Sequence, residues 1–245
     1  MDRMIYLSMS GAKAAMQRQD VLANNLANVS TVGFRAELAD FRAVPVQGSG
    51  ASTRVYALES TVGANHQSGA VQATGRSLDV AMKGNAWLAV QGLDGTEAYT
   101  RAGALDVNPE GIIVTQSGLT VLGDGGPITL PPNSAAAIAA DGTVSASGAN
   151  GRSTVLGRLK LVTPESPAAL QRGSDGLFRG VDGDLSADTT ARLQDGALEG
   201  SNVSAIETMV AMIAAGRQFE QQMKLLQTAE RQEQVAAKLL SPNGM

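Results

Sequence analysis

Residues 5–26 read IYLSMSGAKAAMQRQDVLANNL, and residues 205–226 read AIETMVAMIAAGRQFEQQMKLL. In both stretches apolar residues recur alternately four and three positions apart, with one interruption at Gln19. This spacing places an apolar stripe, here called the seam, along one side of a helix, and the stripe must be buried against another helix. The seam consists of Ile5, Met9, Ala12, Met16, Ala23 and Leu26 in the first stretch, and of Met209, Met212, Gly216, Phe219, Met223 and Leu226 in the second.

The chain between the two stretches has the pattern of β-structure. Short apolar runs alternate with turn signals such as Asp94-Gly95 over residues 78–162, which predicts an antiparallel sheet. We therefore predict an α+β fold in which long N- and C-terminal helices pack together and flank a central antiparallel β-rich domain, a small barrel or a folded sheet. The predicted divisions are an N-terminal assembly helix (1–34), an extended connecting region (35–77), the β domain (78–197) and a C-terminal assembly helix (198–245).

Local signals refine these boundaries. The first helix is predicted over residues 2–28, where Gly33 offers a left-handed stop. The last helix is predicted to begin near Asn202 or Ser204, since Ser204 and Glu207 have capping-box spacing, and to end near residue 240. The Gly/Ser-rich residues 47–53 are predicted to form a loop.

Composition argues against several classes of protein. The net charge of −4 and the 3% aromatic content are unlike those of a nucleic-acid-binding protein, and without cysteine no disulfide or thiolate metal site can form. No apolar run is long enough to cross a membrane or to serve as the core of a secretory signal. With so few aromatic residues, the core should be built from Ala, Val, Leu and Ile.

No set of residues predicts a catalytic, cofactor or metal site. His66 is the only histidine, and we interpret it as a solvated loop residue whose replacement is silent. Residues 182–188 resemble a calcium loop but lack its glycine and its final glutamate. Residues 123–126 are rich in glycine but lead into Pro127, which favours a hairpin turn over a phosphate loop. A cell-wall hydrolase stays open as a remote alternative, with its carboxylates drawn from Glu59, Glu97, Asp106 and Glu110.

Two motifs flank the central domain and carry a family resemblance. Residues 23–35 (ANNLANVSTVGFR) and 198–203 (LEGSNV) resemble the signatures of bacterial flagellar rod and hook proteins, as does the central segment from Asp79 to Gly103. Within that family the chain is similar to proximal-rod members, because it has Trp87-Leu88 where distal-rod and hook members usually have two phenylalanines. The motif residues are Asn24, Asn25, Leu26, Ala27, Asn28, Gly33, Phe34, Glu199, Gly200, Ser201, Asn202 and Val203.

The resemblance implies a structural subunit of the flagellar drive shaft in the periplasm, with no enzymatic activity. Such proteins are exported by the flagellar type III apparatus without a cleaved leader, and their partners are other rod proteins and further copies of themselves. Their terminal helices line the inner tube of the rod, with the β domain outside. A distal-rod or hook subunit is the alternative within the family, and neither nucleic acid nor a small-molecule substrate is implied. Because a lone helix with an exposed seam is marginal in water, we expect the termini to fold on assembly.

Overall fold

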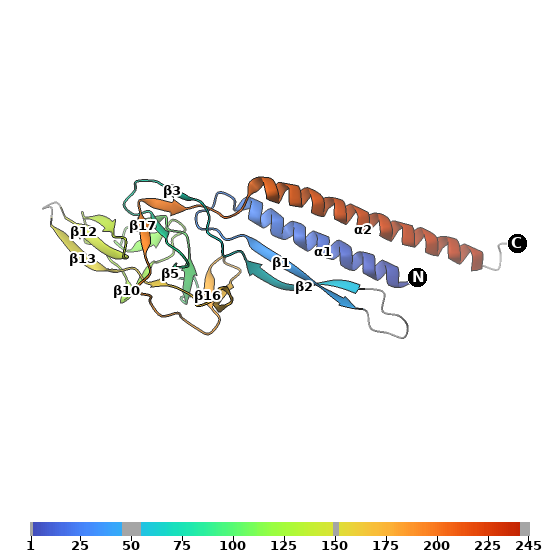
Figure 1. The fold of residues 1–245 in the computed structure, drawn as a ribbon, viewed down its shortest axis with the longest axis horizontal. Helices are drawn as coiled ribbons and strands as arrows, with labels where there is room; N and C mark the ends of the chain where they lie inside the picture. The colour runs from blue at the N-terminus through green and yellow to red at the C-terminus, as the bar shows by residue number, and fades with distance from the viewer. Residues whose placement is uncertain (1, 46–54, 149–151, 241–245) are drawn as a thin grey trace. The chain divides into compact units, whose positions relative to one another are not determined.

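The structure is a computed structural model that describes residues 2–45, 55–148 and 152–240 (Figure 1). The chain forms two compact units. The first comprises Met1–Ala27, Glu37–Ala64 and Ser204–Met245, and the second comprises Asn28–Ala36 and Asn65–Val203. The prediction of terminal helices that pack together, with an antiparallel β-rich region between them in the chain, is confirmed. The predicted loop at 47–53 lies outside the described residues.

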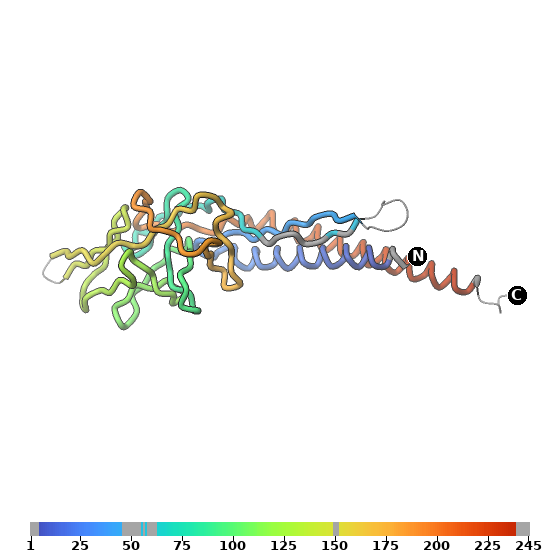
Figure 2. Tube along the Cα trace, turned by 90° about the horizontal axis from the view of Figure 1, so that it is seen from below, coloured from blue at the N-terminus to red at the C-terminus, as the bar shows by residue number. Residues whose placement is uncertain are grey.

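The first unit is built on two antiparallel helices. Helix α1 (Asp2–Ala27) lies beside helix α2 (Ala205–Leu240), and the C-terminal part of α2 continues past the beginning of α1 (Figures 1 and 2). The Ser204 hydroxyl accepts a hydrogen bond from the Glu207 N–H at 3.4 Å, so α2 begins at the predicted cap. None of the described helices is both long enough and apolar enough to cross a membrane.

A β-hairpin completes the first unit. Strands β1 (Glu37–Pro45) and β2 (Val55–Ala64) pair antiparallel, with an irregularity between Asp40 and Phe41. The hairpin contacts α1, where the Ser10 hydroxyl donates to the Ala57 carbonyl at 3.3 Å. Residues 37–64, which the sequence suggested as a connecting region, therefore form part of the helical unit.

The second unit is an assembly of short antiparallel strands. Its largest sheet has five strands in the order β14-β5-β6-β16-β15, and a second sheet has three in the order β11-β12-β13. Four two-stranded ribbons complete the unit: β7 with β8, β9 with β10, β4 with β17 and β3 with β18. The predicted turns at Asp94-Gly95 and at 123–126 join β5 to β6 and β9 to β10. Strands β3, β15, β17 and β18 lie outside residues 78–162, the region in which the sequence predicted short strands.

The strand bounds in this unit are β3 (Val71–Ala73), β4 (Val80–Met82), β5 (Trp87–Gln91), β6 (Glu97–Thr100), β7 (Leu105–Val107), β8 (Ile113–Thr115), β9 (Leu122–Gly123), β10 (Gly126–Pro127), β11 (Ala135–Ile138), β12 (Thr143–Ser147), β13 (Ser153–Arg158), β14 (Leu161–Val162), β15 (Leu170–Arg172), β16 (Phe178–Gly180), β17 (Leu193–Asp195) and β18 (Ala197–Glu199), with a short 3-10 helix, η1, at Pro167–Ala169.

The core of the second unit is mainly aliphatic, as predicted. Val80, Leu88, Leu105 and Leu159 are among the side chains with no exposed surface. Three aromatic residues, Trp87, Tyr99 and Phe178, are buried as well, outside the aliphatic cluster. Trp87 lies beside charged groups described below.

Candidate functional site

The seam on α1 is divided between two environments. Ala12 is buried and Ile5 and Leu26 are half-buried, whereas Met9 and Met16 are 54% and 56% exposed. Ala23 is also exposed. Alternate members of the seam therefore turn toward the interior of the first unit and toward its surface.

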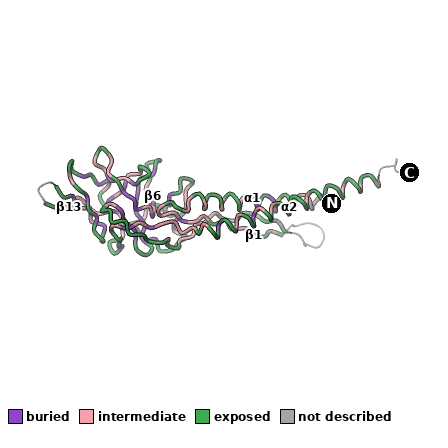
Figure 3. The backbone as a smooth tube through the Cα atoms, turned by 90° about the horizontal axis from the view of Figure 1, so that it is seen from above, coloured by how far each residue is buried: buried purple, intermediate pink, exposed green. Residues whose placement is uncertain are grey.

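The seam on α2 is also divided, although its half-buried and exposed members do not alternate. Met212, Gly216, Phe219 and Leu226 are half-buried, whereas Met209 and Met223 are exposed (50% and 36%). Over both helices more residues are exposed or intermediate than buried (Figure 3). Most of the buried positions of the two helices carry small side chains: Ser8, Ala12 and Ala15 on α1, and Thr208, Ala215 and Ala229 on α2; Asn25 on α1 is the larger exception.

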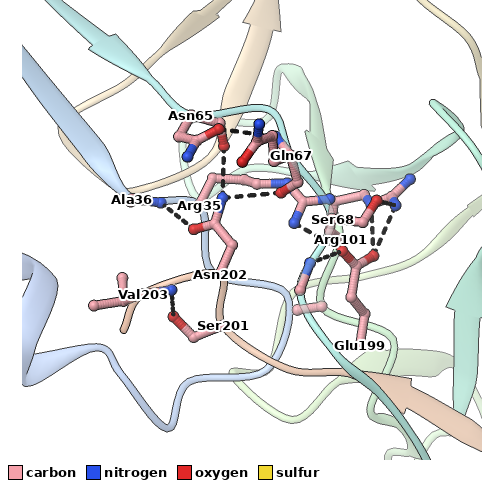
Figure 4. Close-up of polar contacts among 12 residues, drawn as sticks. Arg35, Ala36, Asn65, Gln67, Ser68, Arg101, Glu199, Ser201, Asn202 and Val203 are labelled. Carbon is pink, nitrogen blue, oxygen red and sulfur yellow. Dashed lines mark hydrogen bonds and ion pairs between the residues drawn. The ribbon is translucent and has the colours of Figure 1, made fainter. Parts of the chain in front are cut away.

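Of the motif residues, Glu199 is the centre of a buried ion cluster in the second unit (Figure 4). It ends strand β18, and its side chain is 1% exposed. Its Oε1 lies 2.7 Å from Nη1 of Arg35 and accepts the Gly69 N–H at 2.9 Å. Its Oε2 lies 2.7 Å from Nη2 of Arg101 and accepts the Nε–H of the same arginine at 2.9 Å. A carboxylate that accepts this many donors is well compensated for its burial.

The two arginines of the cluster contact an aromatic ring. The guanidinium carbons of Arg35 and Arg101 lie 5.9 and 5.8 Å from the centre of the Trp87 ring. Arg101 also donates to the carbonyl oxygens of Gly84 and Ala86. The cluster contains two cations for one anion, and the face of the tryptophan stabilises the surplus positive charge.

His66 is not the solvated residue predicted from the sequence. Its ring is half-buried, 6.0 Å from Trp87 and 5.9 Å from Phe178, and its buried Nδ1 has no hydrogen-bond partner within the described residues. Burial, and then the positive charge of Arg35, lower the pKa of His66 below its usual range. The prediction was wrong because nothing in the local sequence shows that residues 65–68 pass beside Trp87.

Two motif asparagines tie distant backbone segments together, one in each unit. In the first unit, Asn25 donates to the Glu37 carbonyl at 2.9 Å and accepts the Glu37 N–H at 2.7 Å. In the second unit, Asn202 accepts the Ala36 N–H at 2.7 Å and donates to the carbonyls of Asn65 and Gln67 at 2.8 and 2.9 Å (Figure 4). Such amides replace backbone pairing where no regular sheet exists.

Gly33 has a conformational reason for its place in the motif. Its φ is +69°, and its N–H donates to the Glu199 carbonyl at 2.7 Å. A Cβ at this position would lie 2.2 Å from the backbone carbon of Arg101. Only glycine fits, because a side chain would meet both an unfavourable dihedral angle and a backbone atom.

The other motif residues lie around these contacts. Phe34 lies under the Arg172 guanidinium at 4.9 Å, the Gly200 N–H donates to the Ala70 carbonyl at 2.8 Å, and Ser201 accepts the Val203 N–H at 3.2 Å. Asn24 and Ala27 are exposed, while Leu26, Asn28 and Val203 are half-buried.

The chain passes between its two units at four points, after residues 27, 36, 64 and 203. Arg35, Asn65 and Asn202 each lie within two residues of one of these points. The buried cluster and the Asn202 contacts therefore connect, inside the second unit, three segments that lead to the first.

The carboxylates considered for hydrolysis have separate partners. Glu97 is held by Lys160 at 2.7 Å and by the Tyr99 hydroxyl at 2.8 Å, and Glu110 accepts from Asn108. Asp106 accepts the N–H of Val107. The side chain of Glu59 lies outside the described set. Among the described residues no group of three or more histidine, cysteine, aspartate or glutamate side chains could hold a metal ion.

Sequence reasoning missed Arg35, Arg101 and Trp87 as members of a buried cluster. Arg35 ends the first motif segment, and Trp87 and Arg101 lie in the central segment from Asp79 to Gly103; membership of these segments is the signal that could have found them. Charged residues beside turns are usually solvated, and their pairing depends on contacts between segments far apart in the sequence.

Three family models match the chain. They are described as "Flagella basal body rod protein" (residues 5–35), "Flagellar hook protein FlgE/F/G D1 domain" (residues 81–146) and "Flagellar basal body rod FlgEFG protein C-terminal" (residues 194–239). The matched ranges include nearly all of α1, much of the β-rich unit and nearly all of α2, and they contain both motifs in full.

Curated relatives align with nearly the whole chain. The flagellar basal-body rod proteins FlgF of Salmonella typhimurium and Escherichia coli K12 are 46% and 45% identical, over 98% of this chain and 99% of theirs. FlgG of Bacillus subtilis is 33% identical over 93% of this chain and 95% of its own length. The chain therefore belongs to the family of flagellar basal-body rod proteins and is FlgF-like.

Proposed function

We propose that this chain is built into the proximal part of the flagellar rod through its terminal helices, as a structural subunit without enzymatic activity. As a member of the rod family it is a structural component of the basal body, serves motility and associates with other rod components. The observation that carries the proximal assignment is the 46% identity to a FlgF protein over nearly the full length of both chains. The finer parts of the proposal are its periplasmic position, its export by the flagellar type III apparatus without a cleaved leader, and its contacts with further copies of itself.

The divided seam supports assembly through the helices. Exposed methionines at heptad positions on both helices leave apolar area in water, and burying such area stabilises an association by about 25 cal/mol per Å². The exposed methionines are long apolar side chains that the first unit leaves accessible, so they remain available to neighbours. In this proposal Met9, Met16, Met209 and Met223 contact other subunits, while Ile5, Ala12, Leu26, Met212, Gly216, Phe219 and Leu226 hold the pair together.

The proposal is tested by complementation of a motile bacterium that lacks its own FlgF. We expect this chain, or a chimera carrying its β-rich unit, to restore swimming and to appear in purified basal bodies at the proximal end of the rod. Recovery of the chain only in the distal rod or hook would support the alternative within the family. Release of soluble muropeptides from purified peptidoglycan would contradict the absence of catalysis.

A further inference from the structure

Helix α2 carries an exposed apolar surface that contains one seam residue, Met209, and three residues outside the seam. Ile206, Met209, Val210 and Ile213 are 77%, 50%, 61% and 58% exposed. Their spacing of i, i+3, i+4 and i+7 places all four on one face of the first two turns, here called the anchor stripe. This is the pattern with which a helix docks into an apolar groove. Glu207, also exposed, lies within the same two turns.

The same unit contains a groove of suitable character. It lies where α1, the β1–β2 hairpin and α2 meet, and it has a volume of about 450 Å³. Leu7, Phe41, Val55 and Leu225 contribute apolar side chains to its lining, and Val55 and Leu225 are themselves 53% and 49% exposed. Arg42 also lines the groove and is exposed, which adds a positive charge.

The anchor stripe cannot occupy the groove of its own molecule. Both surfaces include residues of the single helix α2: the stripe is centred near residue 210, and the groove includes Gln222 and Leu225. At 1.5 Å per residue these positions are roughly 20 Å apart along one continuous helix. A contact between stripe and groove must therefore join two molecules. Because it joins unlike surfaces, it leaves a free stripe and a free groove at the ends and can repeat.

The charges near the two surfaces also favour a contact between stripe and groove. Glu207 accompanies the stripe and Arg42 lines the groove, so the two surfaces carry opposite charges. We infer that the anchor stripe of one copy docks into the groove of the next copy, with Glu207 facing Arg42. The apolar side chains supply the affinity and the charge pair fixes the register. The inference rests on the proposed function as a rod subunit and adds the identity of the contact between copies.

Cysteine cross-linking tests the contact directly, because the chain contains no cysteine of its own. Met209→Cys places a thiol in the stripe and Ala43→Cys places one in the groove, whose lining includes Ala43. A disulfide requires the two Cα atoms to come within about 7 Å. In oxidised basal bodies the full chain with both substitutions should give a ladder of cross-linked multimers, and each single variant should give none. Met209→Cys combined with Leu93→Cys, in the second unit and 94% exposed, is the matched control.

Two results would overturn the inference. A doubly substituted chain that is present in basal bodies but gives no ladder would show that stripe and groove do not meet between copies. Dimers from Met209→Cys alone would show a symmetric contact of stripe with stripe. In both cases the chain is still found in the rod, so the proposed function stands. Absence of the unmodified chain from basal bodies would instead contradict the proposed function.

A charge exchange provides an independent test. Glu207→Arg and Arg42→Glu should each reduce recovery of the chain in basal bodies by about tenfold, and the chain with both should recover most of the loss. Glu207→Arg alone is not diagnostic, because an acidic residue in the first turn also stabilises α2 itself. Arg42→Glu cannot repair that defect, so rescue is specific to a contact between the two residues. Failure of the double variant to rescue, or normal recovery of both single variants, would overturn the inference.

Discussion

Replacement of Glu199 by glutamine should strongly destabilise the second unit. The carboxylate now lies 2.7 Å from Nη1 of Arg35 and from Nη2 of Arg101, and it accepts hydrogen bonds from the Nε–H of Arg101 and from the Gly69 N–H at 2.9 Å. Glutamine has the same shape but offers one acceptor oxygen and turns an NH₂ group toward a guanidinium. At least two charge-assisted hydrogen bonds are lost, each of about 1.5–3 kcal/mol, and two buried cations are left without an anion. Removing one partner of a buried ion pair costs about 3–5 kcal/mol, which agrees with this sum.

The expected change in melting temperature follows from the size of the unit. The second unit has about 150 residues, and in a unit of this size 1 kcal/mol shifts the melting temperature by about 2–4 °C. Calorimetry of the full chain should therefore show the transition of this unit lowered by roughly 6–20 °C in Glu199→Gln. Glu165→Gln is the matched control, because Glu165 is exposed, and its effect should stay within about 0.5 kcal/mol. A loss below about 1 kcal/mol in Glu199→Gln would refute the view that the cluster depends on its carboxylate.

Three further predictions concern the helices, the motif turn and pH. Met16→Asp should abolish swimming but leave the helical content, measured by circular dichroism, unchanged, because Met16 is exposed in the free chain and is proposed to contact neighbours. Leu26→Asp, at a half-buried position, should also lower the helical content. Equal spectra for the two variants would contradict the division of the seam. Gly33→Ala should lower the free energy of unfolding in urea titrations by at least about 1–2 kcal/mol, because the left-handed dihedral angle alone costs that much and the new methyl group meets the backbone of Arg101. An unchanged urea midpoint would show that the turn relaxes freely. Burial lowers the pKa of His66, so the unfolded chain takes up a proton more readily than the folded one, and stability should fall as the pH drops from about 6.5 toward the lower pKa of the folded state. His66→Gln should reduce the loss of stability between pH 7.5 and pH 5.5, measured as the difference between the urea midpoints. An equal loss in the unmodified chain and the variant would exclude His66 as its source.

The periodic spacing of apolar residues predicts the two helices but not how they pack. The heptad spacing predicted two long terminal helices and the seam they share, and Ser204 with Glu207 predicted where α2 begins. Periodicity does not determine which residues of a stripe are buried against other elements of the same molecule. Ala12 is buried whereas Met9 and Met16 are exposed, a division that depends on packing in three dimensions.

The β-rich unit shows a different limit. Runs with apolar residues and flanking turns, such as those forming β5 and β6, were evident in the sequence. Strands β3, β4, β17 and β18 have three residues each, and each pairs with a segment more than 100 positions away. A strand of three residues is too short to show a periodic pattern in the sequence, and the strand that pairs with it is determined only by the tertiary fold.

By itself the sequence determined the α+β class, the two long terminal helices and, through motifs at both ends, the family. These three properties depend on the spacing of residues that are close together in the chain, and this spacing can be read directly from the sequence. Only the tertiary structure determined that Arg35, Arg101 and Glu199 form one buried cluster around Trp87, that His66 packs beside it, and that a groove and an anchor stripe lie on the same unit. Such features depend on contacts between segments far apart in the sequence, such as Arg35 and Glu199, which are 164 residues apart. The energy of a charge depends on whether water or another charge surrounds it.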